Sequence, residues 1–107
     1  MVDLTLDDIE EIPGSVLLEF GTEWCGYCQA AQPLIGSALA KHPNVRHIKI
    51  EDGKGKRLGR QYGIKLWPSL IFIRDGKEIS RLVRPQNADI IEQHLADLEN
   101  PPSPDSQ

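Results

Sequence analysis

The chain has 107 residues, of which 39% are hydrophobic and 26% charged, and its net charge is −4. This length suffices for one domain with a single core. The modest acidity argues against nucleic-acid binding through phosphate contacts, and no apolar run approaches the roughly 20 residues of a membrane-spanning helix. Residues 1–11 are acidic and no apolar signal-peptide core follows them, so we expect a cytoplasmic protein.

The pattern of apolar residues predicts four helices and four strands. In chain order these are a helix at 4–12, a strand at 16–20, a helix at 25–41, a strand at 45–50, a short helix at 57–62, strands at 70–74 and 78–83, and a helix at 88–100. The last two strands form a hairpin, because Asp75-Gly76 is a strong signal for a tight turn. Asn87 is a candidate N-cap of the last helix. The alternation indicates an α/β domain, in which helices flank a mixed sheet of about four strands on both faces.

Residues 101–107 differ in composition from the rest of the chain. They are rich in Pro and Ser and contain no apolar side chain that a core could bury. We therefore predict a single domain at residues 1–100 and a disordered tail at 101–107.

Cys25 and Cys28 are the only cysteines of the sequence and stand between the first strand and the second helix. At the first turn of a helix, the Cys25 sulfur would lie near unsatisfied backbone N–H groups and the positive end of the helix dipole, which favour the nucleophilic thiolate. Cys28 lies one turn further on the same face, within reach to resolve a mixed disulfide. Gly26 between them leaves room for a substrate.

Metal binding and two inert thiols are the alternatives to redox chemistry. One cysteine pair supplies only two of the four ligands of a structural zinc site, and His42 and His47 would complete the set only if the fold brought them in. A cluster that bridges two chains stays open. We interpret the pair as a redox-active dithiol that needs no metal and no further cofactor.

Two segments resemble the thioredoxin family. Residues 20–28 (FGTEWCGYC) resemble its F-x-x-x-W-C-G-P-C signature, and residues 62–70 (YGIKLWPSL) resemble its Y-G-I-x-x-x-P-T-L segment. With Pro33 in the first long helix and the Asp-Gly turn, the match spans residues 16–98. The resemblance implies a thioredoxin-like fold that lacks the family's first strand, and a protein-disulfide oxidoreductase in which Cys25 attacks and Cys28 resolves.

The resemblance also implies a role for Glu19. Thioredoxins carry a buried Asp beneath the second cysteine at this position, although a solvent-facing Glu19 on an edge strand is the alternative. Burial in an apolar strand would raise the pKa of Glu19 and suit it to take the Cys28 proton through a water. The family's Lys partner of that Asp corresponds to His47, and Lys49 lies on the same strand face, so either could approach Glu19.

Pro68 resembles the family's cis-proline, before which backbone N–H and C=O groups can pair with an extended substrate segment. Trp24, Gly26, Tyr27 and Trp67 are the other candidate substrate-binding residues. Trp67 is bulkier than the residue usual before that proline, and would narrow the groove, anchor a partner or pack on Trp24.

Tyr27 and Arg84 also depart from what the resemblance leads us to expect, and two histidines carry no function in it. Tyr27 replaces the family's Pro and restores an N–H that could bind a thiolate, which predicts a reduction potential above the roughly −270 mV of thioredoxin; an exposed aromatic for partner contact is the alternative. Arg84 replaces a Gly beside the active site, where a positive charge would favour acidic partners, unless it is a plain surface arginine. His42 and His94 are interpreted as surface residues without function.

The implied partners are protein disulfides as substrates and a reductase or glutathione as electron donor, with the protein acting as a monomer. The protein could reduce disulfides, or it could isomerise or form them. Its reduction potential and its electron donor decide between these activities. An alternative function of a different class is protein binding without redox activity, with the thioredoxin fold as a scaffold. The intact cysteine pair argues against it.

Overall fold

The computed structural model describes residues 4–53 and 56–100, so the predicted tail at 101–107 lies outside the described residues. All eight predicted elements are present there. They are α1 (Leu6–Glu10), β1 (Ser15–Gly21), α2 (Gly26–Leu39), β2 (Arg46–Glu51), α3 (Arg57–Gln61), β3 (Ser69–Arg74), β4 (Lys77–Val83) and α4 (Ala88–Glu99). Most ends agree within two residues, and α1 is the element that is clearly shorter than predicted. Among the described helices, none is long and apolar enough to cross a membrane.

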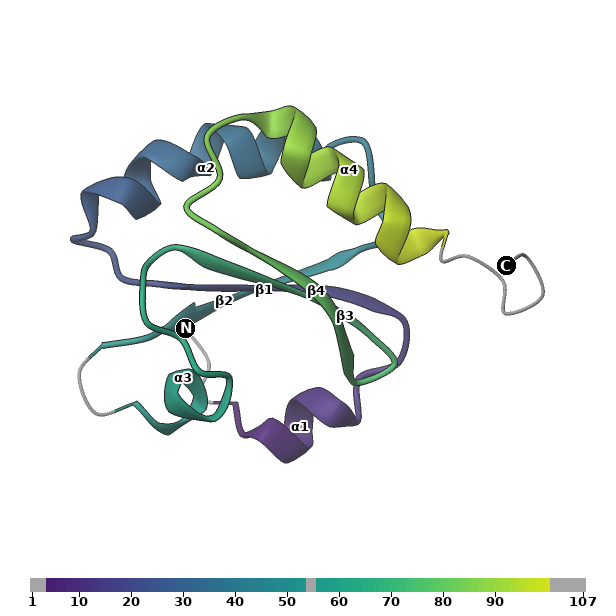
Figure 1. The fold of residues 1–107 in the computed structure, drawn as a ribbon. Coiled ribbons are helices and arrows are strands. Elements are labelled where there is room, and N and C mark those ends of the chain that lie inside the picture. The colour runs from purple at the N-terminus through teal and green to yellow at the C-terminus, as the bar shows by residue number, and fades with distance from the viewer. Residues whose placement is uncertain (1–3, 54–55, 101–107) are drawn as a thin grey trace.

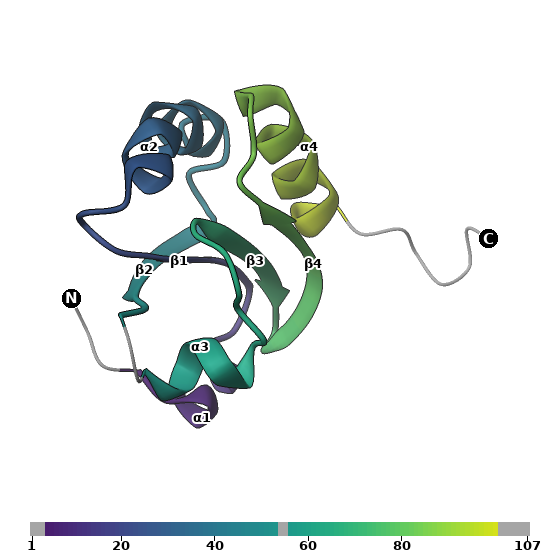
Figure 2. The ribbon, with the colours of Figure 1, turned by 60° about the vertical axis from the view of Figure 1, so that its left-hand side comes forward.

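The four strands form one mixed sheet in the order β2-β1-β3-β4. β1 pairs with β2 in parallel, and the pairs β1–β3 and β3–β4 are antiparallel. Helices α2 and α4 cover one face, and α1 and α3 cover the other (Figures 1 and 2). The predicted mixed sheet of four strands with helices on both faces is therefore confirmed.

The central strand β1 orients the residues that matter for the site. Residues 16–20 are all buried, because both faces of the sheet are covered. Leu17 packs in the cluster with α2 and α4, whereas Val16, Leu18 and Phe20 pack in the cluster on the opposite face. Side chains alternate along a strand, so Glu19 points to the same face as Leu17, toward α2.

The β3–β4 hairpin turns at Asp75-Gly76 as predicted. Both residues have positive φ, 49° and 84°, the combination of a type I′ turn that matches the twist of the strands. A side chain at Gly76 would meet the backbone oxygen of Glu10 at 2.4 Å, so glycine also permits the close approach of α1. Asn87 caps α4 as predicted, since its side chain accepts a hydrogen bond from the Ile90 N–H.

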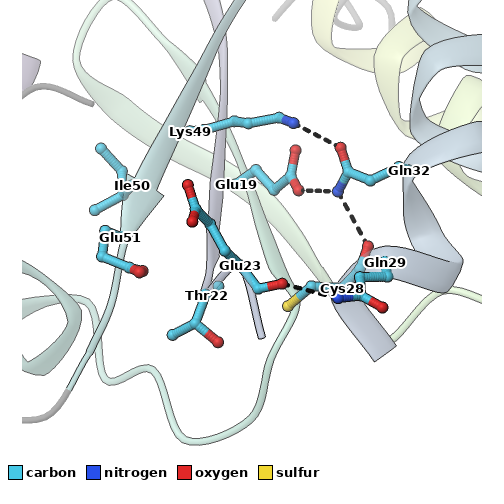
Figure 3. A pocket seen from close by; sticks show the side chains of 10 residues that line it. Glu19, Thr22, Glu23, Cys28, Gln29, Gln32, Lys49, Ile50 and Glu51 are labelled. Carbon is cyan, nitrogen blue, oxygen red and sulfur yellow. Dashed lines mark hydrogen bonds between the residues drawn. The ribbon is translucent and has the colours of Figure 1, made fainter. Parts of the chain in front are cut away.

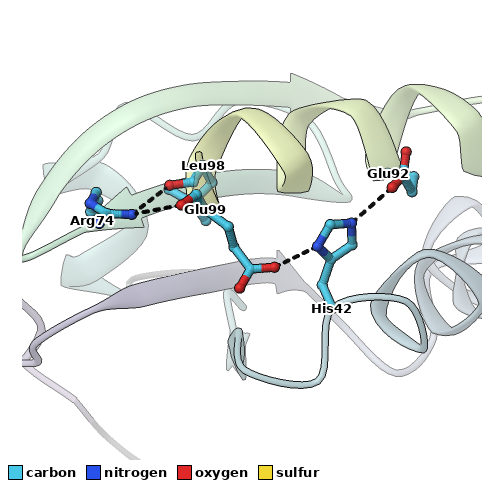
Figure 4. A network of polar contacts seen from close by, with 5 residues as sticks. All are labelled: His42, Arg74, Glu92, Leu98 and Glu99. Carbon is cyan, nitrogen blue, oxygen red and sulfur yellow. Dashed lines mark hydrogen bonds and ion pairs between the residues drawn. The ribbon is translucent and has the colours of Figure 1, made fainter. Parts of the chain in front are cut away.

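The interpretation of His42 as a free surface residue was wrong. Its side chain is only 11% exposed and lies between two carboxylates of α4, with Nδ1 at 2.5 Å from Glu99 and Nε2 at 2.9 Å from Glu92 (Figure 4). Burial alone would lower the pKa of His42, but the hydrogen bonds and charges of the two glutamates outweigh it and raise the pKa. Because both ring nitrogens face acceptors, the imidazolium form fits this site, and it ties the end of α2 to α4.

His94 is not a free surface residue either. It is half-buried on α4, where its ring lies against that of Phe72, with the centroids 5.1 Å apart. Its Nδ1 lies 2.9 Å from the Ser80 hydroxyl on β4. These contacts give His94 a packing role between α4 and the sheet.

Candidate active site

The cysteine pair lies where β1 ends and α2 begins. Cys25 is the N-cap of α2, with extended backbone angles, and its sulfur accepts a hydrogen bond from the Cys28 N–H at 3.2 Å. A sulfur thus takes the place that a Ser or Asp oxygen holds in ordinary helix caps. Both cysteines are free thiols and both are buried. The predicted position of the pair at the first turn of the helix is confirmed.

The Cys28 thiol is held in its protonated form by its surroundings. Burial raises its pKa to about 11, and the hydrogen bond and charge of Cys25 and the charge of Glu19 act in the same direction. At neutral pH, Cys28 therefore needs a base before it can attack a disulfide.

The space for this thiol depends on Gly21. A Cβ at that position would lie 2.6 Å from Cys28 Sγ, well inside van der Waals contact, so any larger residue would displace the sulfur. Gly21 had no role in the sequence analysis, because the contact joins a strand end to a helix and leaves no local pattern.

Glu19 is only 4% exposed, as expected for a residue beneath the second cysteine. Its two oxygens accept hydrogen bonds from the Gln32 side chain at 2.6 Å and from His47 Nε2 at 2.7 Å. His47, and not Lys49, is therefore its hydrogen-bond partner, although Lys49 is the residue that lies opposite Glu19 on β2. Lys49 instead donates to Gln32 Oε1 at 2.7 Å, and Gln32 also donates to the Cys28 carbonyl at 3.0 Å (Figure 3).

The expected rise in the pKa of Glu19 was wrong in direction. Burial is the largest single influence and pushes the pKa up, but the hydrogen bonds from His47 and Gln32, with the charges of His47 and Lys49, outweigh it and lower the pKa. Sequence reasoning counted the desolvation and not the donors that the fold brings to the carboxylate. Glu19 is consequently ionised at neutral pH, and it is a weaker base than a desolvated carboxylate would be.

A cavity of about 220 Å³ joins these groups. It is lined by side chains from β1, α2 and β2 and the segment between β1 and α2, namely Glu19, Gly21, Thr22, Glu23, Cys28, Gln29, Gln32, Lys49, Ile50 and Glu51. Because a water occupies about 30 Å³ of liquid volume, the space suffices for a water between Cys28 and Glu19.

The segment before β3 contacts Trp24, the residue that precedes Cys25. The peptide bond between Trp67 and Pro68 is cis, as the resemblance implies. The Trp67 ring meets that of Trp24 edge-on, with centroids 5.4 Å apart, so the alternative that Trp67 packs on Trp24 is the one that the structure shows. Trp24 and Tyr27 remain exposed by 72% and 61%, and Gly26 is exposed between the cysteines.

Asp52 supports Trp67 and was missed by the sequence analysis. Its carboxylate is buried and accepts a hydrogen bond from the Trp67 indole N–H at 2.8 Å. Burial raises the pKa of Asp52, and the indole hydrogen bond opposes that rise. Gly59 makes room for the carboxylate, since a Cβ there would lie 1.9 Å from Asp52 Oδ1. Asp52 and Gly59 belong to no sequence motif, so nothing in the sequence pointed to them. Gln32 could have been found, because it follows Cys28 by four residues and therefore lies on the same face of the helix.

Tyr27 does not bind the Cys25 sulfur through its backbone. Within residues 4–53 and 56–100, the N–H that donates to Cys25 Sγ is that of Cys28. The reason given for a raised reduction potential is therefore not supported, whereas the exposed ring of Tyr27 agrees with the alternative of partner contact.

The zinc alternative finds no support in the described part of the chain. It contains no group of three or more His, Cys, Asp or Glu side chains that could hold a metal ion. His42 and His47 are engaged with glutamates instead and do not complete a site with the cysteine pair.

Comparison with known proteins agrees with this geometry. The family model described as Thioredoxin matches residues 6–97. The chain is 37% identical over 70 residues to the thioredoxin of Chlamydia trachomatis, covering 65% of this chain and 69% of the relative. It is 32% identical over 108 residues to protein disulfide-isomerase A3 of Gallus gallus, covering 96% of this chain and 21% of that protein.

The solved structures give the same result. Thioredoxin 2 from Pseudomonas aeruginosa, in its reduced form, superposes with a TM-score of 0.83 at 46% identity, covering 91% of this chain and 90% of that one. The thioredoxin-like fold expected from the sequence is thereby confirmed. The chain belongs to the thioredoxin family, and with the Cys25–Cys28 pair it is a thiol–disulfide oxidoreductase.

Proposed function

We propose that this protein reduces disulfides of other proteins, with Cys25 as the attacking thiol and Cys28 as the resolving thiol. The observation that carries this assignment is the hydrogen bond from the Cys28 N–H to Cys25 Sγ at the N-cap of α2. The donor N–H and the start of α2 both face the sulfur that carries the negative charge in the attacking form of a cysteine. The same contact holds Cys28 close to the Cys25 sulfur at the start of α2, so that Cys28 can attack after Cys25 has reacted.

In the first step, the Cys25 thiolate attacks one sulfur of the substrate disulfide. A bond forms between Cys25 Sγ and that sulfur, the substrate S–S bond breaks, and the second substrate sulfur leaves as a thiolate that takes a proton from water. In the second step, Cys28 loses its proton and attacks Cys25 Sγ. The Cys25–Cys28 disulfide forms and the first substrate sulfur leaves as a thiol, so two electrons have passed to the substrate.

Glu19 is the proposed acceptor of the Cys28 proton, through a water in the cavity that both residues line. It is ionised at neutral pH, because its pKa is lowered. Gln32 is the proposed positioning residue, since it binds both the carboxylate and the Cys28 carbonyl. His47 links the carboxylate to the surface, with a quarter of its side chain exposed.

Five residues around Cys25 are the proposed contacts of the substrate. Trp24, Gly26 and Tyr27 present an exposed surface beside the sulfur. Trp67 offers its backbone N–H next to the cis bond to Pro68, because the carbonyls of Trp67 and Pro68 already accept hydrogen bonds from Arg84. The redox couple is the cysteine pair itself, and no further cofactor enters the scheme. A thioredoxin reductase, or glutathione in its place, would return the disulfide to the dithiol. We further propose that residues 1–100 act as one domain, as a monomer in the cytoplasm.

The first experiment is the reduction potential of the cysteine pair, measured by equilibration in graded redox buffers with Trp24 fluorescence and thiol trapping as readouts. A value near −270 mV, about that of thioredoxin, supports a reductant served by a reductase. A value at or above about −200 mV favours oxidation or isomerisation, the activity named for the relative from Gallus gallus. A pair that does not cycle at all overturns the enzymatic proposal in favour of a binding module.

A further inference from the structure

Arg84 is fixed by three contacts to Tyr27, Trp67 and Pro68, which are among the proposed substrate contacts. Its backbone N–H donates to the Pro68 carbonyl at 3.0 Å, and its Nε donates to the Trp67 carbonyl at 2.8 Å. Its guanidinium carbon lies 3.9 Å from the centre of the Tyr27 ring, a cation–π contact. The side chain is thus held beside both chain segments that flank Cys25, and it is in place before a substrate arrives.

The backbone at Arg84 indicates that this position is unusual for an arginine. Its φ is 50°, in the left-handed region that side chains other than Gly, Asn and Asp seldom adopt. The three contacts offset this cost. A glycine would adopt the same conformation without strain, so the arginine contributes something that the backbone does not require.

Within the described residues, most of the N–H donors of the Arg84 side chain have no hydrogen-bond partner. A guanidinium has five N–H donors in one plane, and one of them serves the Trp67 carbonyl. No carboxylate of residues 4–53 or 56–100 forms an ion pair with Arg84, whereas Arg81 on the same hairpin binds Glu78 through two hydrogen bonds. Asp52, which binds Trp67, is buried and engaged with the indole N–H. In the described part of the chain, the Arg84 guanidinium therefore has no anionic partner.

Exposed apolar side chains lie on the same chain segments as the contacts of Arg84. Trp24 and Tyr27 are exposed by 72% and 61%, and Leu66 and Val83 are roughly half exposed. Leu66 and Val83 directly precede Trp67 and Arg84, the residues joined by the Nε hydrogen bond. The surface thus offers apolar contact together with one positively charged, planar donor group, which suits an extended peptide segment with an acidic side chain.

We propose that Arg84 selects substrate segments with Asp or Glu beside the disulfide cysteine, by pairing its free N–H groups with that carboxylate. This inference rests on the proposed reduction of protein disulfides and names the class of substrate for the same site. The carboxylate would bind at the outer edge of the guanidinium, while Nε keeps the Trp67 carbonyl and the ring of Tyr27 supports the cation from one face. Recognition then adds a charged contact to the sequence-tolerant pairing of the substrate backbone with the Trp67 N–H.

The test uses symmetric disulfide-linked dimers of a short peptide with Glu, Gln or Lys on both sides of its single cysteine. Both sulfurs of such a dimer carry the same neighbours, so the side attacked makes no difference. The second-order rate constant for oxidation of the reduced protein is followed by Trp24 fluorescence. We expect the Glu peptide to react about two- to fivefold faster than the Gln peptide, and the Lys peptide to be slower than Gln by a similar factor, as for a partly exposed ion pair. The differences should shrink in about 1 M salt.

Two variants carry the test, and both suit the positive φ. Arg84→Gly should bring the three rate constants together, and Arg84→Asp should reverse their order. Arg81→Ala, which removes a guanidinium from the same hairpin, should leave the order unchanged. A purely structural Arg84 predicts that Arg84→Gly slows all three peptides equally and keeps their ratio, and that result overturns the inference, as does a wild-type protein that does not distinguish them. Reduction of the Gln peptide checks the proposed function separately, because it needs no acidic side chain.

Discussion

Replacement of Glu19 by Gln removes the proposed base and leaves a side chain of the same shape. The attack by Cys25 should proceed at its ordinary rate, because Glu19 contacts Gln32 and His47 and not the Cys25 sulfur. The resolving step should slow, because Cys28 must then ionise unaided. The variant is therefore expected to accumulate the mixed disulfide between Cys25 and substrate.

The size of the effect follows from the pKa of Cys28. With a pKa of about 11, only about one thiol in 10⁴ is ionised at pH 7, and this fraction grows about tenfold for each pH unit. A positioned base contributes about 10²- to 10⁴-fold, and the lowered pKa of Glu19 places it at the weak end of that range. We expect the resolving step of Glu19→Gln to be about a hundredfold slower than that of the wild type at pH 7. This difference should disappear near about pH 9. Because the Glu19 charge raises the pKa of Cys28, its loss lowers that pKa, and the two rates should become equal at a slightly lower pH.

Rapid acid quench and mass spectrometry separate the two steps, because they count reduced protein, mixed disulfide and oxidised protein at each time. The wild type should show a resolving rate that varies little around neutral pH, whereas in Glu19→Gln it should rise about tenfold per pH unit. Glu23→Gln, which neutralises another carboxylate lining the same cavity, is the matched control and should behave as the wild type. Equal resolving rates in Glu19→Gln and wild type across this pH range would refute the assignment of Glu19 as the base.

Three further predictions concern stability. Gly21→Ala should destabilise the reduced protein by about 1–3 kcal/mol, because the added Cβ would press on the buried Cys28 thiol. The control Gly36→Ala, in an open helical position, should be neutral or stabilising by up to about 1 kcal/mol. Urea unfolding of both variants measures these changes. The raised pKa of His42 means that its ion pairs stabilise the fold fully below about pH 6.5, the pKa of an unfolded histidine, and that this stability is lost as pH rises through the higher folded value; His42→Gln should abolish that dependence. Trp67→Phe should keep the ring packing but leave the buried carboxylate of Asp52 without its donor, at a cost of about 1–3 kcal/mol in thermal unfolding and with a further rise in the pKa of Asp52.

The sequence predicted the order of the elements and the position of the cysteine pair, because both rest on local patterns. Apolar periodicity marked the strands, Asp75-Gly76 marked the hairpin, and two motifs in the right order marked the site. The pKa of Glu19 could not be predicted in the same way. Its sign depends on donors from α2 and β2, and a carboxylate in an apolar strand looks the same in the sequence whether or not those donors reach it.

The positions that depart from the thioredoxin pattern are better understood together than singly. Taken one at a time, Tyr27, Trp67 and Arg84 suggested a changed potential, a narrowed groove and a stray surface charge. In the structure the guanidinium of Arg84 rests on the ring of Tyr27 and binds the carbonyl of Trp67, so each residue supports the next. The energetic effects of substitutions in such a contact network do not add. Reversion of any one residue to the family's usual type is therefore expected to disturb the contacts of the other two.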